Sequence, residues 1–443
     1  MNVGKAWSVV LGFALCSSAV WVGQSGAEDW PQWRGPRRDG TWTTEGLLEE
    51  LPATPKVLWS MPIGAGYSGP TVADGRVFVT DRLDDPTEVE RIHCFDFQTG
   101  KALWTREYAC DYGAIGYKAG PRAAVSVDGN YAYALGATGR LHCLNVENGE
   151  TVWQRDLDAE YDISREDNQN RMPIWGISAS PLLFEDLLIL QIGGREKACV
   201  VALDKLTGAE RWRALDDQAQ YSAPILIRQA GRDVVVVWTG DSVAGMDARS
   251  GEVYWRHVMK PTRMPIGCAT PIVHGDMLFV TSFYDGSLML KLDQDQPAVS
   301  EVWRAIGPSE QDTRALHSII STPIWLDEHI YGVDSYGELR CLEASTGARV
   351  WEDTTATPKA RWSTIHFTQN GEKTWMFNER GELLISRLSP AGFEELSRTR
   401  IIEPTMEQLR RRQGVCWAHP AFADGRVLAR NDNQIVCIDI RSQ

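Results

Sequence analysis

The 443-residue chain lacks three features that would place it in common functional classes. It has no basic surplus: its net charge is −14, and because an acidic surface repels phosphate backbones, we exclude nucleic acid as a partner. It has no long apolar run after residue 22, so we expect no membrane-spanning segment in the mature protein. Helical heptads are scarce, and short β-branched runs between Gly, Asp and Asn residues predict an all-β protein.

The first residues have the pattern of a secretory signal peptide. Lys5 precedes an apolar stretch over residues 6–22, and Ser25-Gly26-Ala27 is a small-x-small cleavage site. An uncleaved transmembrane anchor is the alternative, but two serines interrupt an apolar stretch of marginal length. We therefore predict a signal peptide at residues 1–27 and an exported protein, either periplasmic or secreted.

Glycine and tryptophan are abundant, with 39 and 18 residues. Gly-x-x-x-Trp occurs five times, each time with an acidic or amide residue four positions before the glycine, and two further tryptophans fit this spacing more loosely. Successive tryptophans lie 43 to 59 residues apart, which is typical of a β-propeller with four strands in each blade. The repeated tryptophans are Trp59, Trp104, Trp153, Trp212, Trp255, Trp303 and Trp351.

Counting first strands predicts eight blades. These strands are expected near Pro70, Pro121, Pro181, Pro224, Pro271, Pro323, Trp362 and Pro420. The eighth blade stops at Asp439, one strand short, and the isolated segment 57–62 supplies a strand that contains Trp59. The prediction is an all-β, eight-bladed propeller of four-stranded antiparallel blades, with the ring closed by an N-terminal strand.

The repeated residues have a structural interpretation. We expect each tryptophan to wedge between neighbouring blades and donate its N–H to a backbone carbonyl, while the Asp and Gly shape the preceding turn. Cys94, Cys143, Cys341 and Cys437 share one repeat position, with Cys199 close to it, and are predicted to be buried thiols. A disulfide remains an open alternative among the other cysteines of the mature chain, which are Cys110, Cys268 and Cys416.

The Asp-x-x-x-Gly-x-x-x-Trp signature resembles the repeat of the pyrroloquinoline-quinone (PQQ) family over residues 57–440. The segment Asp29–Pro36 resembles a leader found on PQQ-repeat proteins of unknown role, so we expect a leader at 28–56 and a propeller domain at 57–443. The resemblance implies one of two branches. One contains quinoprotein dehydrogenases that use PQQ and calcium, and the other contains non-catalytic, BamB-like assembly factors of the bacterial outer membrane.

The family's catalytic parts are missing from the sequence. The dehydrogenases carry a vicinal Cys-Cys disulfide and some carry Cys-x-x-Cys-His for haem, but neither motif occurs here, and residues 416–419 have the wrong spacing. No calcium-binding cluster can be assigned from spacing alone. We therefore predict a non-catalytic scaffold, without a cofactor, that binds a protein or peptide partner in the cell envelope. The alternatives are a PQQ- and calcium-dependent oxidoreductase and a sugar-binding propeller.

A ligand site is expected where the loops that enter the first strands converge on the channel mouth. The candidate contacts are Tyr67, Arg122, Trp175, Tyr221, His317, Trp362, Trp417 and His419. Cations recur in the same loops: Lys118, Arg122, Arg171, Arg263, Arg314 and Arg361. The mouth could bind an anion or an acidic peptide, or these side chains could simply plug the channel.

Three further segments contain residues that suit a site less well. His317-Ser318 with Asp312 or Asp334 contains the residue types of a hydrolase triad, but no nucleophile elbow accompanies them. Residues 158–171 and 394–414 are insertions, expected to be solvated loops or partner contacts. Within the second insertion, residues 407–412 suggest a short helix.

Overall fold

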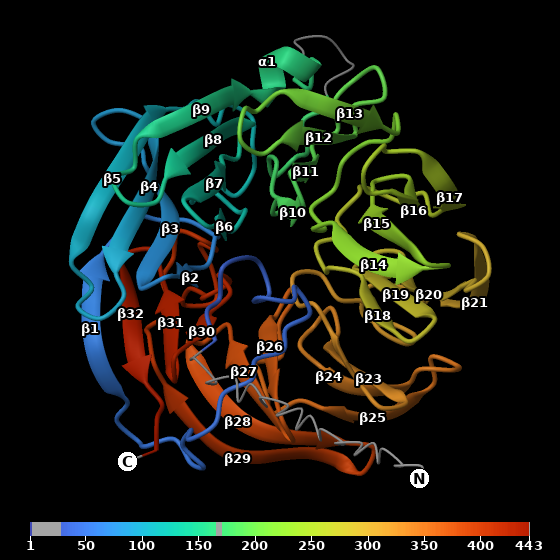
Figure 1. Cartoon of the computed structure of the whole chain (residues 1–443). Coiled ribbons are helices and arrows are strands. Elements are labelled where there is room, and N and C mark those ends of the chain that lie inside the picture. Colours follow the sequence, from blue (N-terminus) through green and yellow to red (C-terminus); the bar gives the residue numbers. More distant parts are fainter. Residues whose placement is uncertain (2–27, 165–170, 443) are drawn as a thin grey trace.

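The computed structural model describes residues 1, 28–164 and 171–442. Eight four-stranded antiparallel sheets stand around a central axis, which confirms the predicted eight-bladed β-propeller (Figure 1). The predicted signal peptide lies, apart from Met1, outside the described residues. None of the helices in the described part of the chain has the length and apolar character of a membrane span.

Each blade is numbered from its innermost strand outwards. Blades 1 and 2 contain β2 (Thr71–Ala73), β3 (Arg76–Leu83), β4 (Val89–Asp96), β5 (Ala102–Ala109), β6 (Ser126–Asp128), β7 (Tyr131–Leu135), β8 (Arg140–Asn145) and β9 (Thr151–Asp156). Blades 3 and 4 contain β10 (Leu182–Phe184), β11 (Leu187–Gln191), β12 (Val200–Asp204), β13 (Glu210–Ala214), β14 (Ile225–Gln229), β15 (Arg232–Trp238), β16 (Ser242–Asp247) and β17 (Val253–Val258).

The second half of the ring follows the same order. Blades 5 and 6 contain β18 (Ile272–His274), β19 (Met277–Ser282), β20 (Gly286–Leu292), β21 (Val299–Ala305), β22 (Ile324–Leu326), β23 (His329–Val333), β24 (Leu339–Glu343) and β25 (Arg349–Asp353). Blades 7 and 8 contain β26 (Ile365–Asn370), β27 (Lys373–Asn378), β28 (Glu382–Ser389), β29 (Gly392–Arg400), β30 (Ala421–Ala423), β31 (Arg426–Arg430), β32 (Gln434–Asp439) and β1 (Lys56–Pro62).

The two ends of the chain meet in blade 8. β1 pairs antiparallel with β32, so the N-terminal strand completes the blade as predicted. Arg430 is fully buried at the seam with blade 1 and donates to the carbonyls of Thr80 and Gly64. Strands from both ends of the chain therefore belong to one sheet, and this sheet closes the ring.

The repeated indoles lie on the outermost strands and reach the next blade. Trp59 Nε1 donates to the Phe97 carbonyl at 2.9 Å, and Trp104 Nε1 donates to the Val146 carbonyl at 2.9 Å. A β-bulge directly precedes each of these tryptophans and turns the ring toward the neighbouring blade. The receiving Gly100 has no room for a side chain, because a Cβ there would lie 2.6 Å from the Trp59 ring.

Four of the repeated cysteines lie directly across the strand pair from a tryptophan: Cys94, Cys143, Cys341 and Cys437. Ala202 takes this position opposite Trp212, so Cys199 is not its equivalent. The described cysteines are all free thiols, and no disulfide joins Cys110, Cys268 and Cys416. Burial raises the pKa of Cys94, Cys143 and Cys437 to about 12, which makes these thiols poor nucleophiles.

Trp255 is held differently, because the next blade lacks the turn glycine. Its Nε1 donates to Oε1 of Gln229, a fully buried residue of its own blade, at 2.9 Å. The Gln229 amide nitrogen then donates to the carbonyls of Asp293 and Ala298 in blade 5. A side-chain amide therefore bridges the gap that the missing glycine turn leaves.

Blade 7 has no outer tryptophan, and the leader compensates. Ser397 is paired opposite Ile385, the position that a tryptophan takes in the other blades. Its Oγ accepts a hydrogen bond from the Leu51 backbone N–H at 2.9 Å. Leu47, Leu48 and Leu51 pack against the hydrophobic cluster shared by blades 7, 8 and 1.

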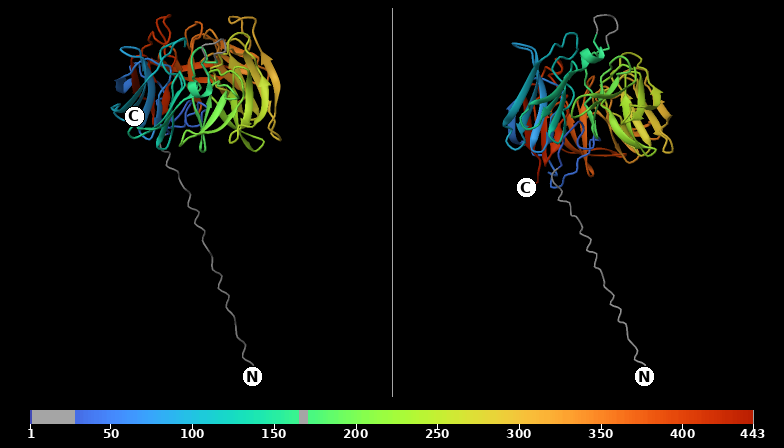
Figure 2. Two further views of the ribbon diagram at one scale, coloured as in Figure 1. Left: turned by 90° about the horizontal axis from the view of Figure 1, so that it is seen from above. Right: turned by 45° about the horizontal axis from the view of Figure 1, so that its top comes forward.

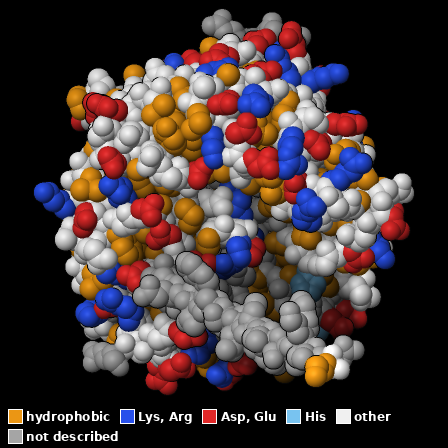
Figure 3. All heavy atoms as spheres, in the orientation of Figure 1, with side chains coloured by type: hydrophobic (Ala, Val, Ile, Leu, Met, Phe, Trp, Pro, Cys, Tyr) orange, Lys and Arg blue, Asp and Glu red, His pale blue; other side chains and the backbone are white. Residues whose placement is uncertain are grey.

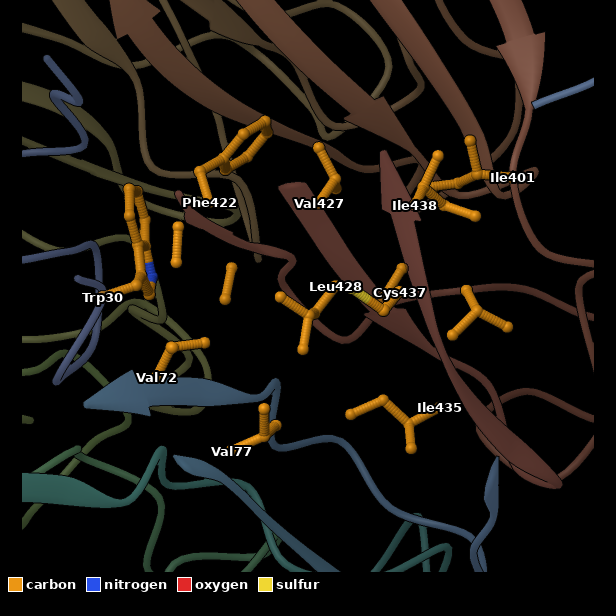
Figure 4. Close-up of a cluster of buried hydrophobic side chains, with 14 of the residues drawn as sticks. Trp30, Val72, Val77, Ile401, Phe422, Val427, Leu428, Ile435, Cys437 and Ile438 are labelled. Atoms are coloured by element: carbon orange, nitrogen blue, oxygen red, sulfur yellow. The ribbon is translucent and has the colours of Figure 1, made fainter. Parts of the chain in front are cut away.

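The leader crosses one face of the ring (Figures 1 and 2), and its Trp33 side chain reaches the cavity in the channel. Trp30 forms a β-bridge with Val72 of β2, and its ring packs on Phe422 of β30 at 5.7 Å (Figure 4). Arg38 donates to the carbonyls of Ser180, Pro181 and Pro224, which belong to two more blades. Acidic and basic side chains are interspersed over this face (Figure 3).

Some predicted boundaries were wrong. Proline directly precedes six of the eight innermost strands, but β6 begins five residues after Pro121 and β26 begins three residues after Trp362. Residues 394–400 are not a loop, since they belong to β29. Residues 407–412 form turns without a helix, and the helix α1 (Leu157–Tyr161) lies at the start of the first insertion instead.

We predict that Gln229→Met destabilises the protein by about 1–3 kcal/mol, because it leaves the buried Trp255 N–H and the half-buried Asp293 carbonyl without partners, while the Ala298 carbonyl keeps its bond from the Asp293 N–H. Urea unfolding followed by fluorescence measures this loss. Gln296→Met, an exposed substitution in the neighbouring turn, is the control. Equal loss in both variants would show that the amide bridge is dispensable.

Candidate functional site

A cavity of about 140 Å³ lies in the channel, where the loops that enter the innermost strands converge. These loops lie on the opposite face from the leader. The cavity is lined mainly by aromatic side chains that come from most of the blades. Its lining residues include Trp33, Tyr67, Tyr117, Arg122, Trp175, Ser178, Tyr221, Cys268, Trp362, His366, Trp417 and His419.

Seven of the eight predicted contact residues line this cavity, and His317 does not. His317 is buried between blades 5 and 6: its Nδ1 lies 3.0 Å from the Phe283 carbonyl, and its Nε2 accepts from the Gly307 N–H. Its loop begins at the channel, but these backbone contacts turn the ring into the seam between blades. The prediction of His317 as a ligand contact therefore has no support in the geometry.

Other lining residues were missed. Trp33 comes from the leader, and Tyr117 has a left-handed backbone with φ of 54°. His366 is the second residue of β26, the innermost strand that was expected to begin near Trp362. A periodic tryptophan pattern gives no signal for any of these residues, because none of them lies at a repeat position.

The aromatic rings form a connected wall. Trp175 stacks on Tyr221, with ring centroids 4.9 Å apart and planes 26° apart. Tyr117 meets the edge of Trp175 at 5.6 Å and of Trp362 at 5.8 Å. Trp362 in turn lies 6.5 Å from Trp417. Such tilted and offset contacts are favourable arrangements for aromatic rings, so the rings stabilise one another in positions around the cavity.

Guanidinium groups lie over two rings of the lining, those of Tyr67 and Trp362. Arg122 lies 5.0 Å above the Tyr67 ring and donates to the Tyr117 carbonyl. Arg361 lies 4.4 Å above the Trp362 ring, and Arg411 lies 5.5 Å above the same ring. The rings are thus already engaged by cations, which disfavours a cationic ligand.

The other predicted cations are less central. Arg361 also forms an ion pair with Glu310 at 2.8 Å, and Arg171 pairs with Asp216 at 2.7 Å, away from the cavity. Lys118 donates to the Gly113 carbonyl, and Arg263 lies over the Tyr284 ring at 4.9 Å. Arg314 is exposed. Among the predicted cations, only Arg122 lines the cavity itself.

The floor contains Trp33, His366 and His419. Trp33 Nε1 donates to Thr270 Oγ1 at 2.8 Å, and its ring meets the His419 ring edge-on at 4.6 Å. Burial lowers the pKa of His366 to about 4, with nearby Arg34 adding to the effect. Burial, with His366 as a neighbour, lowers the pKa of His419 to about 3. Both imidazoles are therefore neutral at neutral pH.

Three buried polar atoms of the lining have no hydrogen-bond partner among the described residues: Ser178 Oγ, Trp362 Nε1 and His419 Nε2. Buried polar groups are normally paired, with protein, water or a ligand. The cavity therefore offers an occupant one donor, Trp362 Nε1, one acceptor, His419 Nε2, and one hydroxyl, Ser178 Oγ. The occupant's other contacts would be mainly with aromatic carbon atoms.

The residue types of a hydrolase triad at positions 317, 318 and 334 are not arranged as a triad. Ser318 is buried and its hydroxyl donates to the Val333 carbonyl at 2.6 Å. His317 is held by backbone groups, and Asp334 accepts from the His317 backbone N–H rather than from its ring. Because the serine hydroxyl is committed elsewhere, these residues do not form a triad.

The donor set of the cavity does not fit a calcium–PQQ pair. Calcium prefers several carboxylate and carbonyl oxygens, and no carboxylate lines the cavity in the described chain. Glu379 lies just behind it, 3.4 Å from Trp417 Nε1 and 3.2 Å from Arg412. Burial raises the pKa of Glu379. No group of three His, Cys, Asp or Glu residues among the described residues is arranged to hold a metal ion.

Comparison with known proteins places the chain among PQQ-type propellers. The family model described as outer membrane protein assembly factor BamB matches residues 43–166, 88–353 and 312–443. No curated protein matches the chain.

Three solved structures share the fold. BamB from Moraxella catarrhalis is 15% identical with a TM-score of 0.58, covering 88% of this chain and 99% of its own. A quinohemoprotein alcohol dehydrogenase from Comamonas testosteroni is 13% identical with a TM-score of 0.65, covering 94% and 81%. A europium-containing methanol dehydrogenase is 12% identical with a TM-score of 0.63, covering 93% and 89%.

We predict that the protein loses stability as the pH falls from about 6.5 toward 4. His366 and His419 have lowered pKa values in the folded protein, so the unfolded chain binds more protons over this range. Melting temperatures at stepped pH measure the slope, which His419→Phe should make shallower. His274→Phe, at an exposed imidazole on β18, is the control for loss of a histidine. An unchanged slope in His419→Phe would contradict the assignment.

Proposed function

The chain belongs to the family described as outer membrane protein assembly factor BamB, and on this premise we propose that it is an exported, non-catalytic propeller that binds a protein or peptide partner at the open face of its channel. The observation that carries the proposal is the central cavity, which is aromatic, closed on one side by the leader and lined by no carboxylate of the described chain. Such a cavity suits recognition of a side chain better than acid–base chemistry.

The size of the cavity suits one aromatic ring. Its volume of about 140 Å³ is similar to that of an engineered cavity of about 150 Å³ that binds benzene. The unpartnered Trp362 Nε1 and His419 Nε2 could bond a phenol or an indole N–H. We infer that an aromatic side chain of the partner enters the cavity as an anchor, as aromatic residues commonly do at interfaces.

The charges around the mouth favour an acidic partner segment. Arg122 and Arg411 have no ion pair with a carboxylate in the described chain, and both lie over rings that line the cavity. Acidic residues on either side of the aromatic anchor would approach these guanidinium groups. Charge complementarity of this kind increases the association rate and the specificity more than it increases the affinity.

A sugar is the second candidate ligand. The Trp175 ring, stacked on the buried Tyr221 ring, lines the cavity, and an aromatic ring is the kind of surface that a pyranose ring contacts. The oxidoreductase alternative has the fold of the two dehydrogenases in its favour. The lining lacks carboxylates for calcium, so we place this alternative behind both binding functions.

We expect acidic peptides of about twelve residues with a central Trp, Tyr or Phe to bind the protein. Replacing the central aromatic residue by alanine should weaken binding about 30-fold, which is the effect of losing an interface anchor of about 2 kcal/mol. Arg122→Met should weaken binding of the acidic peptides about tenfold and should leave binding of their neutral counterparts nearly unchanged. Fluorescence anisotropy of labelled peptides measures both effects.

Arg228→Met is the matched control, since this exposed arginine belongs to β14 and does not line the cavity. Equal binding of the aromatic and alanine peptides would refute the anchor. A glycan array that gives hits where peptides give none would favour the sugar ligand. Stoichiometric uptake of PQQ with calcium, together with dye-linked alcohol oxidation, would replace the proposal by the oxidoreductase function.

We also predict that the mature chain begins at Glu28, after cleavage of the expected signal peptide at Ala27. The intact mass of the protein recovered from the cell envelope or the medium measures the cleavage site. A protein that retains residues 1–27 in the membrane fraction would instead support the transmembrane anchor.

A further inference from the structure

Two arginines of the leader are buried where it crosses the channel. Arg34 is 8% exposed and Arg38 is 7% exposed, so both charges are removed from water. Arg38 donates to three backbone carbonyls and to Gln32 Oε1, which uses most of its N–H groups. Arg34 donates through Nη2 to the Asp39 carbonyl, but its Nη1 has no partner among the described residues.

No carboxylate neutralises this pair. Neither guanidinium forms an ion pair in the described chain; the Asp39 carboxylate attracts Arg34 only at longer range, and Arg34 lies close enough to Arg38 to repel it. Burial lowers the pKa of Arg34 to about 10 and that of Arg38 to about 9, so both remain protonated at neutral pH. Burying an uncompensated charge is costly, and an unpaired guanidinium N–H adds to that cost.

A small cavity adjoins Arg34. Its volume is about 20 Å³, slightly more than the roughly 10–15 Å³ that one water molecule requires. Trp30, Arg34, Thr322, His366 and His419 are among its lining residues. Trp30 Nε1 is also buried without a partner, so two N–H donors at this cavity have no acceptor in the described chain.

The leader is built to keep this space open beside the guanidinium. Gly40 lines the cavity with φ of 80°, and a Cβ there would lie 2.7 Å from Arg34 Nη2. Trp33, His366 and His419 line both cavities, so they separate the small one from the aromatic cavity. The small cavity therefore lies beneath the floor of the candidate site.

We propose that this cavity binds a single chloride-sized anion, held by the Arg34 guanidinium and the Trp30 indole N–H. An anion supplies the acceptor that both donors lack and also offsets the buried positive charge. A water molecule would supply the acceptor but not the charge. The neighbouring imidazoles are neutral, so they add no competing charge of either sign. The bound anion would fasten the leader to the blades and so hold the floor of the aromatic cavity in place.

The first test is thermal stability in sodium chloride against sodium gluconate at equal ionic strength. We expect the melting temperature to rise with chloride alone, by about 1–2 °C for each tenfold increase above the dissociation constant. Bromide should act like chloride, and sulfate should not, because it is too large for the cavity. Arg34→Met should abolish the chloride effect. Arg37→Met, at an exposed leader arginine that pairs with Glu28, should leave it unchanged.

The second test needs no variant, so it remains decisive if Arg34→Met does not fold. Crystals of the wild-type protein soaked in sodium bromide should give one buried anomalous peak within hydrogen-bond distance of Arg34 Nη1 and Trp30 Nε1. A water molecule there at saturating bromide, or equal melting temperatures in chloride and gluconate, would overturn the proposal.

Discussion

The ring depends on one interaction, in which an indole on the outer strand of one blade is seated on the next blade. Backbone hydrogen bonds hold each four-stranded sheet together, and between blades they run through the loops rather than the strands, for example from the Tyr67 N–H to the Pro121 carbonyl. The connection comes from a bulge that turns the tryptophan outward, a carbonyl that accepts its N–H, and a glycine that leaves room for its ring. Repeating this contact around the axis sets the spacing of the blades, and with it the width of the central channel.

The sequence was sufficient to predict the fold because this contact leaves a spaced signature. The period and the outer-strand position of the tryptophans follow from the glycine and tryptophan spacing, and the closing strand at 57–62 follows from an eighth blade that stops one strand short at Asp439. The exceptions could not be predicted. Gln229 bridges blades through a long-range amide contact, and Ser397 receives the leader, yet neither residue differs in type from many surface residues.

The candidate site was predicted only in part, for the same reason. Loops that enter the innermost strands must converge on the axis, so their aromatic residues could be assigned to the mouth. Side-chain direction within a loop depends on backbone contacts far apart in sequence. His317 turns away from the channel for that reason, whereas Trp33 enters it from a segment with no repeat pattern.

The position of the leader and of β1 has a consequence for how the molecule assembles. Both segments are made first, but their binding surfaces belong largely to blades 7 and 8, which are made last. Until the C-terminal strands are present, β1 has no strand to pair with and the leader lacks part of the surface on which it packs. Closure therefore spans almost the whole chain, a long-range step of the kind that slows folding. A chain released early from synthesis would be left as an open arc that exposes strand edges and apolar blade faces, the features that promote aggregation.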